Sequence, residues 1–277
     1  MNEAGRRRPR SPVPSRVEGV SRHPRPAGSG ATDFEPGILA NRSGAGVRIA
    51  LIDSGINAAH SHVGPLAGGV AFSSAPNREI QQAGDYRDTL GHGTALAGIL
   101  KFKAPEAELF AVKIFTDRLV TSIEVLEAAL LWAIRQKIHV VNLSLGTANV
   151  EHRSRMLKIT AEARREGTLI AASSPAEKTE ILPAALDGVF GVAASEECSW
   201  SEYQYVRKGS IRFRAHPSPR PLPGLDQSRN YRGHSFASAH LSALLALLVQ
   251  DRPGLGFDAA RERLIKCAGR SLPLKLP

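Results

Sequence analysis

The chain of 277 residues lacks most features that mark exported or membrane proteins. It has only two cysteines, Cys198 and Cys267, which lie far apart and match no metal-ligand spacing. No apolar run of about 18 residues is present, so the sequence predicts no membrane span. Residues 1–25 contain no apolar core of the kind found in secretory signals. These absences predict a cytoplasmic protein with reduced thiols.

Aromatic residues are scarce, at 5% of the chain, whereas the net charge is high, at +10. Two segments carry this excess. Residues 1–26 hold seven arginines against two glutamates, and residues 207–232 hold seven basic residues against Asp226. Such patches can bind nucleic acid, but no interleaved aromatic pattern or known binding module accompanies them. We therefore expect no nucleic-acid partner, and we interpret the basic tail as solvated and able to recruit an acidic partner.

Residues 1–35 are rich in proline, arginine and serine and poor in apolar side chains. Such a segment buries too little surface to fold, so we expect a disordered tail. We expect the remaining residues, 36–277, to form one domain, because α/β folds of this size are often single domains. Within it, residues 207–232 show no clean period and are expected to form a long surface excursion.

Apolar strands alternate with helical patterns along the rest of the chain. Strands are predicted at residues 47–52, 107–115, 138–143, 168–172 and 185–194. Helices are predicted from a capping box at Thr121–Glu124 to Gln136, over residues 151–166, and from Asp258 as cap to Gly269. This alternation predicts an α/β fold of three layers, α/β/α, around a mainly parallel sheet.

Three stretches each place one chemically active residue within two positions of a glycine. Asp53 follows the first predicted strand, at the end where functional groups collect in parallel sheets. His92 lies between two glycines at the start of a helical run of small residues. Ser235 precedes the apolar run Leu241–Val249, which predicts a buried helix with the serine at its N-terminus. Each stretch alone also fits a simple helix cap or turn.

Together the three residues are the parts of a nucleophilic catalytic set. A serine hydroxyl needs a base such as histidine to remove its proton, and a carboxylate holds that histidine in the productive tautomer. In the order Asp, His, Ser, this chain resembles the subtilisin (subtilase) family. Six ordered matches carry the resemblance over residues 45–270: Ala50–Ile56 (ALIDSGI), His60, His92–Gly98 (HGTALAG), Ala104–Lys113 (APEAELFAVK), Val141–Gly146 (VNLSLG) and Gly233–His240 (GHSFASAH).

The resemblance implies a serine endopeptidase with Asp53 orienting His92, His92 acting as general base and acid, and Ser235 as nucleophile. It also implies an extended substrate peptide lying between two edges of the chain. The substrate-binding residues would be Ser144, Leu145 and Gly146 on one edge and Leu119, Val120 and Thr121 on the other. Phe115 and Leu126 would wall the deeper pockets.

The chain departs from the family pattern at the oxyanion hole. The family places an asparagine after a strand ending A-A-G-N, but here the chain reads Ala171-Ala172-Ser173-Ser174-Pro175-Ala176. Depending on the register, Ser174, Pro175 or Ala176 takes that place, so the nearest side-chain donor is Ser174. In addition, His234 replaces the threonine that usually precedes the nucleophile.

Two further departures concern segments that are typical of the family. The segment between His92 and Lys113 is shorter than in secreted members and lacks the helix insertion that carries a calcium site, so we expect no metal and no other cofactor. Residues 1–45 are too short and polar to fold as the inhibitory pro-domain.

These observations predict a selective cytoplasmic endopeptidase that processes one leader or partner peptide, because a degradative protease without a pro-domain would threaten its own cell. The alternative is a catalytically weak or inactive subtilase-fold protein that binds a peptide or partner. The complete triad favours the enzyme, and the altered oxyanion strand favours the alternative.

Overall fold

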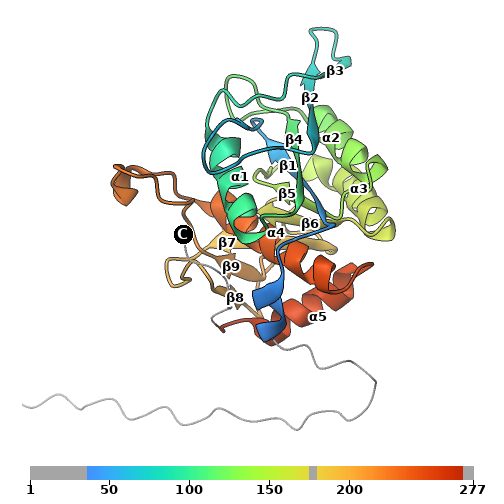
Figure 1. The fold of residues 1–277 in the computed structure, drawn as a ribbon. Helices are drawn as coiled ribbons and strands as arrows, with labels where there is room; N and C mark the ends of the chain where they lie inside the picture. Colours follow the sequence, from blue (N-terminus) through green and yellow to red (C-terminus); the bar gives the residue numbers. More distant parts are fainter. Residues whose placement is uncertain (1–35, 175–179, 271–277) are drawn as a thin grey trace, which may run out of the picture. The chain divides into compact units, whose positions relative to one another are not determined.

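A computed structural model describes residues 36–174 and 180–270 (Figure 1). Residues 1–35, for which we expect disorder, lie outside the described residues. Within the described part, no helix is long and apolar enough to cross a membrane.

A nine-stranded sheet runs through the described residues in the order β3-β2-β4-β1-β5-β6-β7-β9-β8. The five predicted strands are all present, within a few residues of their expected bounds: β1 Arg48–Asp53, β4 Glu108–Lys113, β5 Val140–Leu143, β6 Leu169–Ser173 and β7 Val189–Ala194. They pair in parallel, as do β2 (Gly68–Ser74) with β4 and β9 (Phe213–Ala215) with β7. Only the edge strands β3 (Ile80–Ala83) and β8 (Tyr203–Tyr205) are antiparallel to their neighbours.

Five α-helices cover the two faces of this sheet (Figure 1). They are α1 His92–Lys103, α2 Ile123–Arg135, α3 Arg153–Arg165, α4 His234–Asp251 and α5 Phe257–Cys267, with short 3-10 turns at Pro36–Asn41, Val150–His152 and Gln227–Arg229. Alternate residues of β1 point to opposite layers: Ile49 and Leu51 pack with α1, α4 and α5, whereas Ala50 and Ile52 pack with α2 and α3. This confirms the expected three-layer α/β/α fold with a mainly parallel sheet.

Helix α4 is the central element of one layer. Every residue from Phe236 to Val249 is buried, which agrees with the uncharged run Leu241–Val249 in the sequence. The helix packs against α1 and against the strands β5, β6, β7 and β9. Its N-cap, Gly233, has a φ of 145°, a conformation that favours glycine. The first turn of the most buried helix therefore presents Ser235.

The expectation of a surface excursion over residues 207–232 is wrong for its first part. Phe213–Ala215 form strand β9 inside the sheet, and Ile211, Phe213 and Ala215 are buried. A strand of three residues is too short to give a readable period, and the surrounding arginines conceal it. The second part, residues 216–232, contains a single 3-10 turn.

Two helix caps also differ from the sequence prediction. Ser122, rather than Thr121, is the N-cap of α2, because its side chain accepts a hydrogen bond from the Val125 amide at 3.3 Å. Gly256 is the N-cap of α5, so Asp258 lies in the first turn instead of capping the helix. At that place its charge still interacts favourably with the helix dipole.

Candidate active site

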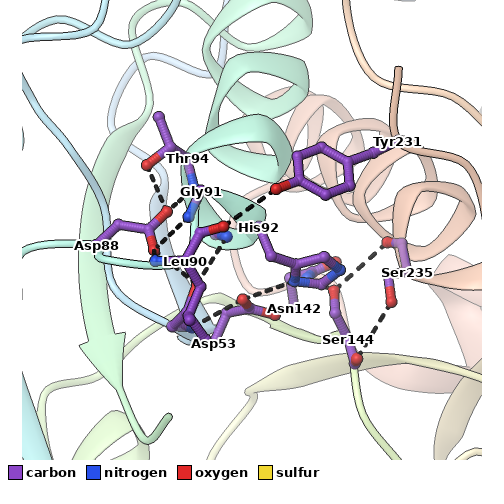
Figure 2. A network of polar contacts seen from close by, with 12 residues as sticks. Asp53, Asp88, Leu90, Gly91, His92, Thr94, Asn142, Ser144, Tyr231 and Ser235 are labelled. Atoms are coloured by element: carbon purple, nitrogen blue, oxygen red, sulfur yellow. Dashed lines mark hydrogen bonds and ion pairs between the residues drawn. The ribbon is translucent and has the colours of Figure 1, made fainter. Parts of the chain in front are cut away.

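The fold brings three predicted residues to the carboxyl edge of the parallel strands. Asp53 is the last residue of β1, and His92 is the first residue of α1. Ser235 lies in the first turn of α4. Figure 2 shows the His92 imidazole in contact with Asp53, with Ser235 on the opposite side in that view. The carboxyl ends of strands thus meet two helix N-termini, where backbone N–H groups favour negative charge.

Asp53 and His92 form a buried pair. The Nδ1 atom of His92 lies 2.8 Å from Oδ1 of Asp53, which also accepts a hydrogen bond from the Ser54 amide at 2.7 Å. Asp53 is 0% exposed and His92 is 8% exposed. Burial lowers the pKa of His92, but the hydrogen bond to Asp53 and the charges of Asp53 and Asp88 outweigh it and leave that pKa above its usual value. The pair therefore holds His92 through Nδ1 and raises its basicity, while Nε2 takes no part in the contact with Asp53.

Asp88 anchors the turn that carries His92. Its Oδ1 atom accepts hydrogen bonds from the Leu90 and Gly91 amides and from the Ser54 hydroxyl, each at 2.9 Å. Its Oδ2 atom accepts from the amide and hydroxyl of Thr94, at 2.8 and 2.6 Å. These bonds satisfy amide groups at the N-terminus of α1 and join that turn to the end of β1 (Figure 2).

Close packing and aromatic rings hold His92 from two other sides. A Cβ atom on Gly93 would lie 2.1 Å from the Gly55 carbonyl oxygen, so only glycine allows this approach between α1 and the turn after β1. Tyr231 and Phe236 make edge-on ring contacts with the imidazole at 6.2 and 5.6 Å. Tyr231 also donates its hydroxyl to the Leu90 carbonyl at 3.0 Å. The ring of His92 is thus held in one orientation.

Ser235 does not hydrogen-bond to His92 in this structure. Its Oγ atom donates instead to the Ser144 carbonyl at 3.2 Å. Catalytic hydrogen bonds are commonly long or absent before substrate binds. The Ser235 amide lies in the first turn of α4, so it has no partner within the helix.

A buried polar chain connects β5 to α4 beneath Ser235. Asn142 is 0% exposed, and its Nδ2 donates to the Ser144 hydroxyl at 2.8 Å while its Oδ1 accepts from Ser242 at 2.9 Å. Ser144 and Ser238 both donate to the Ser235 carbonyl, at 3.4 and 2.8 Å. Because buried polar groups are costly unless paired, this chain fixes the register between the strand and the helix that carries Ser235.

Five of the six residues predicted to bind substrate line one cavity of about 260 Å³. Leu119, Val120 and Thr121 form one wall, and Leu145 and Gly146 form the other. Phe115 and Leu126, predicted for the deeper pockets, also line it. Ser144 does not line this cavity and instead contacts Ser235. Leu119 and Val120 are exposed, at 49% and 74%, although both are large apolar residues, which is typical of an open binding groove.

Ser174, the predicted oxyanion donor, directly follows β6 and is buried, and its amide donates to the Val192 carbonyl at 2.9 Å. Pro175 and Ala176, the other candidates for this place, lie outside the described residues. His234 is half-buried, and its Nδ1 accepts a hydrogen bond from the Ala194 amide at 2.9 Å. An accepting Nδ1 places the proton of the neutral ring on Nε2, and burial lowers the pKa of His234 and favours that neutral form. The roles of Ser174 and His234 stay predictions.

The described residues do not fit the calcium site that the family resemblance suggests. Between His92 and Lys113 the only carboxylates are Glu106 and Glu108, and Glu106 accepts a hydrogen bond from Ser43. Nowhere in residues 36–174 and 180–270 do three or more His, Cys, Asp or Glu side chains cluster in a way that could hold a metal. A calcium ion takes about 6–8 oxygen ligands.

We therefore expect melting temperature and activity to be the same in EDTA and in calcium. Differential scanning fluorimetry with 5 mM of either reagent, on the full chain, measures this. A decrease of several degrees in EDTA that calcium reverses would contradict the expectation.

Sequence reasoning missed Asp88, Asn142 and Tyr231 as parts of the site. Asp88 stands close before a helical run, a place where acidic side chains often cap, so a signal was present. Asn142 stands inside an apolar strand, which is an unusual place for a polar residue and was a second signal. No local pattern distinguishes Tyr231, because its contacts with Leu90 and His92 depend on tertiary structure.

An Asp–His pair beside a serine at a helix N-terminus is the set of groups that serine hydrolases use. The subtilase family model matches residues 44–275, and the chain therefore belongs to the subtilase family. It is 29% identical over 248 residues to the minor extracellular protease Epr of Bacillus subtilis, covering 82% of this chain and 36% of that protein. It is 28% identical over 245 residues to a thermostable alkaline protease of Halalkalibacterium halodurans, covering 81% and 63%.

The solved structure of sphericase has the same fold, with a TM-score of 0.64 at 22% identity over 83% of this chain and 88% of that chain. The chain spans only 36% and 63% of the lengths of the two curated proteases named above. We therefore treat the activity of the whole protein as a proposal.

Proposed function

We propose that this protein is a serine endopeptidase in which Ser235 is the nucleophile, His92 the general base and acid, and Asp53 the orienting carboxylate. The observation that carries the proposal is the 2.8 Å contact between His92 and the fully buried Asp53, at the end of the sheet where α4 presents Ser235. The substrate chain lies extended in the groove between Leu119–Thr121 and Leu145–Gly146, with Ser144 at the end nearest Ser235.

The reaction follows from these positions. The Ser235 Oγ attacks the peptide carbonyl while its proton passes to Nε2 of His92, and the charge of the buried Asp53 stabilises the imidazolium. Negative charge develops on the carbonyl oxygen, and the Ser235 amide at the N-terminus of α4 donates to it. The C–N bond then breaks, and His92 gives its proton to the leaving amine. Water repeats these steps on the acyl-enzyme and releases Ser235.

An ester substrate tests this mechanism. With p-nitrophenyl acetate, a nucleophilic serine releases a burst of nitrophenol that matches the enzyme concentration before slower steady turnover. Stopped-flow absorbance should show this burst for the full chain and not for Ser235→Ala. Steady turnover that persists in Ser235→Ala would show that another group performs the chemistry.

We propose further that the enzyme is selective and acts inside the cell on one leader or partner peptide. Cys198 and Cys267 are both buried and unpaired, which suits a reducing compartment. The exposed apolar walls of the groove suit an apolar substrate segment. Fractionation of cells that express the tagged chain, followed by comparison of N-terminal peptides with those of a Ser235→Ala strain, tests this. One or a few changed cleavage sites in the cytoplasm would support it, and a general loss of many proteins would contradict it.

A specific observation also supports the second candidate, a subtilase-fold protein that binds a peptide without cutting it. The Ser235 hydroxyl bonds to the Ser144 carbonyl rather than to His92. The oxyanion asparagine is also missing from the sequence. On this alternative the groove binds its peptide, the wild-type protein releases no cleavage product, and Ser235→Ala leaves the affinity unchanged.

We expect a slow peptidase, because a serine hydroxyl is a shorter and more freely rotating donor than the missing asparagine. Ser174→Ala should lower kcat by about tenfold or less if its hydroxyl helps, compared with about 10²–10³ for the asparagine of subtilisin. Asparagine introduced separately at Ser174 and Ala176 should raise kcat at one of the two positions. Steady-state kinetics on one peptide measures all three. If wild-type turnover is already fast and none of the changes alters it, another group donates to the oxyanion. His234→Thr then tests whether the Nε2–H of His234 is that donor.

A further inference from the structure

A second cavity, of about 290 Å³, lies beside the N-terminus of α1. It is built by three segments that are distant in sequence, residues 57–62, 88–95 and 219–231. It shares no lining residue with the groove between Leu119–Thr121 and Leu145–Gly146. The proposed mechanism gives it no role.

Among the described residues, the cavity is lined by a cation that has no carboxylate partner, Arg220. Its buried Nε atom also has no hydrogen-bond partner in this part of the chain. The guanidinium carbon lies 4.6 Å from the centre of the Phe102 ring. Burial lowers the pKa of Arg220, but an arginine keeps its charge in proteins. A buried donor of this kind is costly unless a ligand satisfies it.

Two histidines stand beside this arginine. The rings of His60 and His62 make an edge-on contact at 5.1 Å. His62 and Arg220 both pack on Gly98 of α1, where an added Cβ would lie 3.3 Å from the His62 Cβ and 3.9 Å from the Arg220 Cδ. Burial and the neighbouring charges of Arg220 and His60 lower the pKa of His62. An anion in the cavity would relieve this repulsion among like charges.

The cavity has one carboxylate of its own among the described residues, and that group is already engaged. Asp88 lines the cavity but accepts five hydrogen bonds from Ser54, Leu90, Gly91 and Thr94. Its charge is thus directed to the N-terminus of α1. Arg220 and the two histidines are left to face the cavity, and this lining favours an anion over a cation.

The cavity also lies next to His92, the residue that protonates the leaving amine in the proposed mechanism. It adjoins Gly91, which precedes His92, and Tyr231, whose ring contacts His92 at 6.2 Å. In the proposed mechanism His92 gives a proton to the leaving amine, so the chain after the cut bond passes this residue. In the same mechanism the acyl half would occupy the separate groove lined by Leu145 and Gly146.

We propose that this cavity binds a carboxylate on the leaving half of the substrate, held by Arg220 with His60 and His62, so that the enzyme selects peptides with an acidic residue shortly after the cut bond. The inference rests on the proposed peptidase function. The carboxylate is either the side chain of Asp or Glu or the C-terminus of a short leaving peptide, and both present the same planar anion to a guanidinium.

Cleavage of a proteome-derived peptide library, read by mass spectrometry, tests the preference. At one of the first three positions after the cut bond, we expect Asp and Glu to be about tenfold enriched over Asn and Gln. Arg220→Met keeps an apolar stem on Phe102 and should reduce this ratio to about one, and Arg220→Glu should favour Lys instead. Arg252→Met is the matched control, since Arg252 is exposed and follows the 18 residues of α4, about 27 Å of helix from its start. It should keep the wild-type ratio.

Two matched substrates distinguish a side-chain carboxylate from a C-terminal one. The first has Glu after the cut bond and an amidated C-terminus. The second has Gln after the cut bond and a free C-terminus two residues after the cut. A preference for the first identifies the side chain, and a preference for the second identifies the terminus. Equal cleavage of acidic and amide peptides by wild type, or a ratio unchanged in Arg220→Met, would overturn the proposal.

A binding measurement tests the anion site independently of the proposed peptidase activity. Fluorescein-labelled random peptide pools that carry a fixed run of three glutamates or three glutamines are titrated with the Ser235→Ala protein, and anisotropy reports affinity. Tighter binding of the glutamate pool that Arg220→Met abolishes supports the anion site even if no peptide is cut. Equal binding of both pools, before and after Arg220→Met, overturns it.

Discussion

Ser235→Ala and His92→Ala should each reduce peptide cleavage to near the uncatalysed level. Removal of the corresponding serine or histidine lowers kcat about 10⁶-fold in subtilisin, and a loss of the same order is expected for Ser235 and His92 if they form one catalytic unit. Turnover of a fluorogenic peptide, measured with stoichiometric enzyme over hours, checks this. Residual activity above about 1% of wild type in folded Ser235→Ala would contradict the assignment.

The two variants should differ in stability, which provides the control. Ser235→Ala removes only the 3.2 Å hydrogen bond to the Ser144 carbonyl, so its melting temperature should be close to wild type. His92→Ala leaves the carboxylate of Asp53 buried at 0% exposure without its main partner, which costs about 1–3 kcal/mol. The double variant should be no less active than either single variant, because members of one catalytic unit fail together.

Asp88→Ala should be the most destabilising polar substitution near the site. It removes the acceptor of five hydrogen bonds at the N-terminus of α1, of which three come from amides at the start of that helix. Loss of a helix cap and of bonds to a charged acceptor should cost about 2–4 kcal/mol. For a domain of this size that lowers the melting temperature by about 5–15 °C, measured by calorimetry.

Asp85→Ala is the matched control, since Asp85 stands in the same loop but is exposed and pairs only with Arg87. It should change the melting temperature by less than about 2 °C. An equal effect of the two substitutions would contradict the role of Asp88.

A second readout of Asp88 is the pH profile. The base form of His92 is needed, so kcat/KM should fall as pH decreases through the pKa of His92, which the neighbouring charges raise. Asp88→Asn removes one of these charges and should move the acidic limb to lower pH. A limb that stays in place would show that Asp88 acts on stability alone.

The strands and helices that carry long apolar runs could be predicted from the sequence, whereas the short edge elements could not. Strand β1 and helix α4 are strongly apolar along their length, so burial dictates their structure. Strand β3 is largely exposed and β9 has three residues, so their pairing depends on the sheet that is already formed around them. For this reason the sequence of residues 207–232 predicts only a surface segment and does not indicate β9.

The identity of the triad residues could be predicted, but the arrangement that supports them could not. Asp53, His92 and Ser235 each lie within two positions of a glycine in an ordered motif. The bond from the Ser54 hydroxyl to Asp88 and the bond from Ser242 to Asn142 join residues that are 34 and 100 positions apart. The basic cavity around Arg220 is likewise formed by three separate segments, so no single stretch of sequence indicates it.

Covalent labelling of Ser235 tests the central claim most directly. The full chain is incubated with a fluorophosphonate probe at neutral pH, and digestion with mass spectrometry locates the adduct. An activated serine should give one adduct, on the peptide that contains Ser235, and the adduct should disappear in Ser235→Ala and in His92→Ala. Absence of an adduct on folded wild-type protein, or labelling that is unchanged in His92→Ala, would contradict the peptidase and favour the peptide-binding alternative.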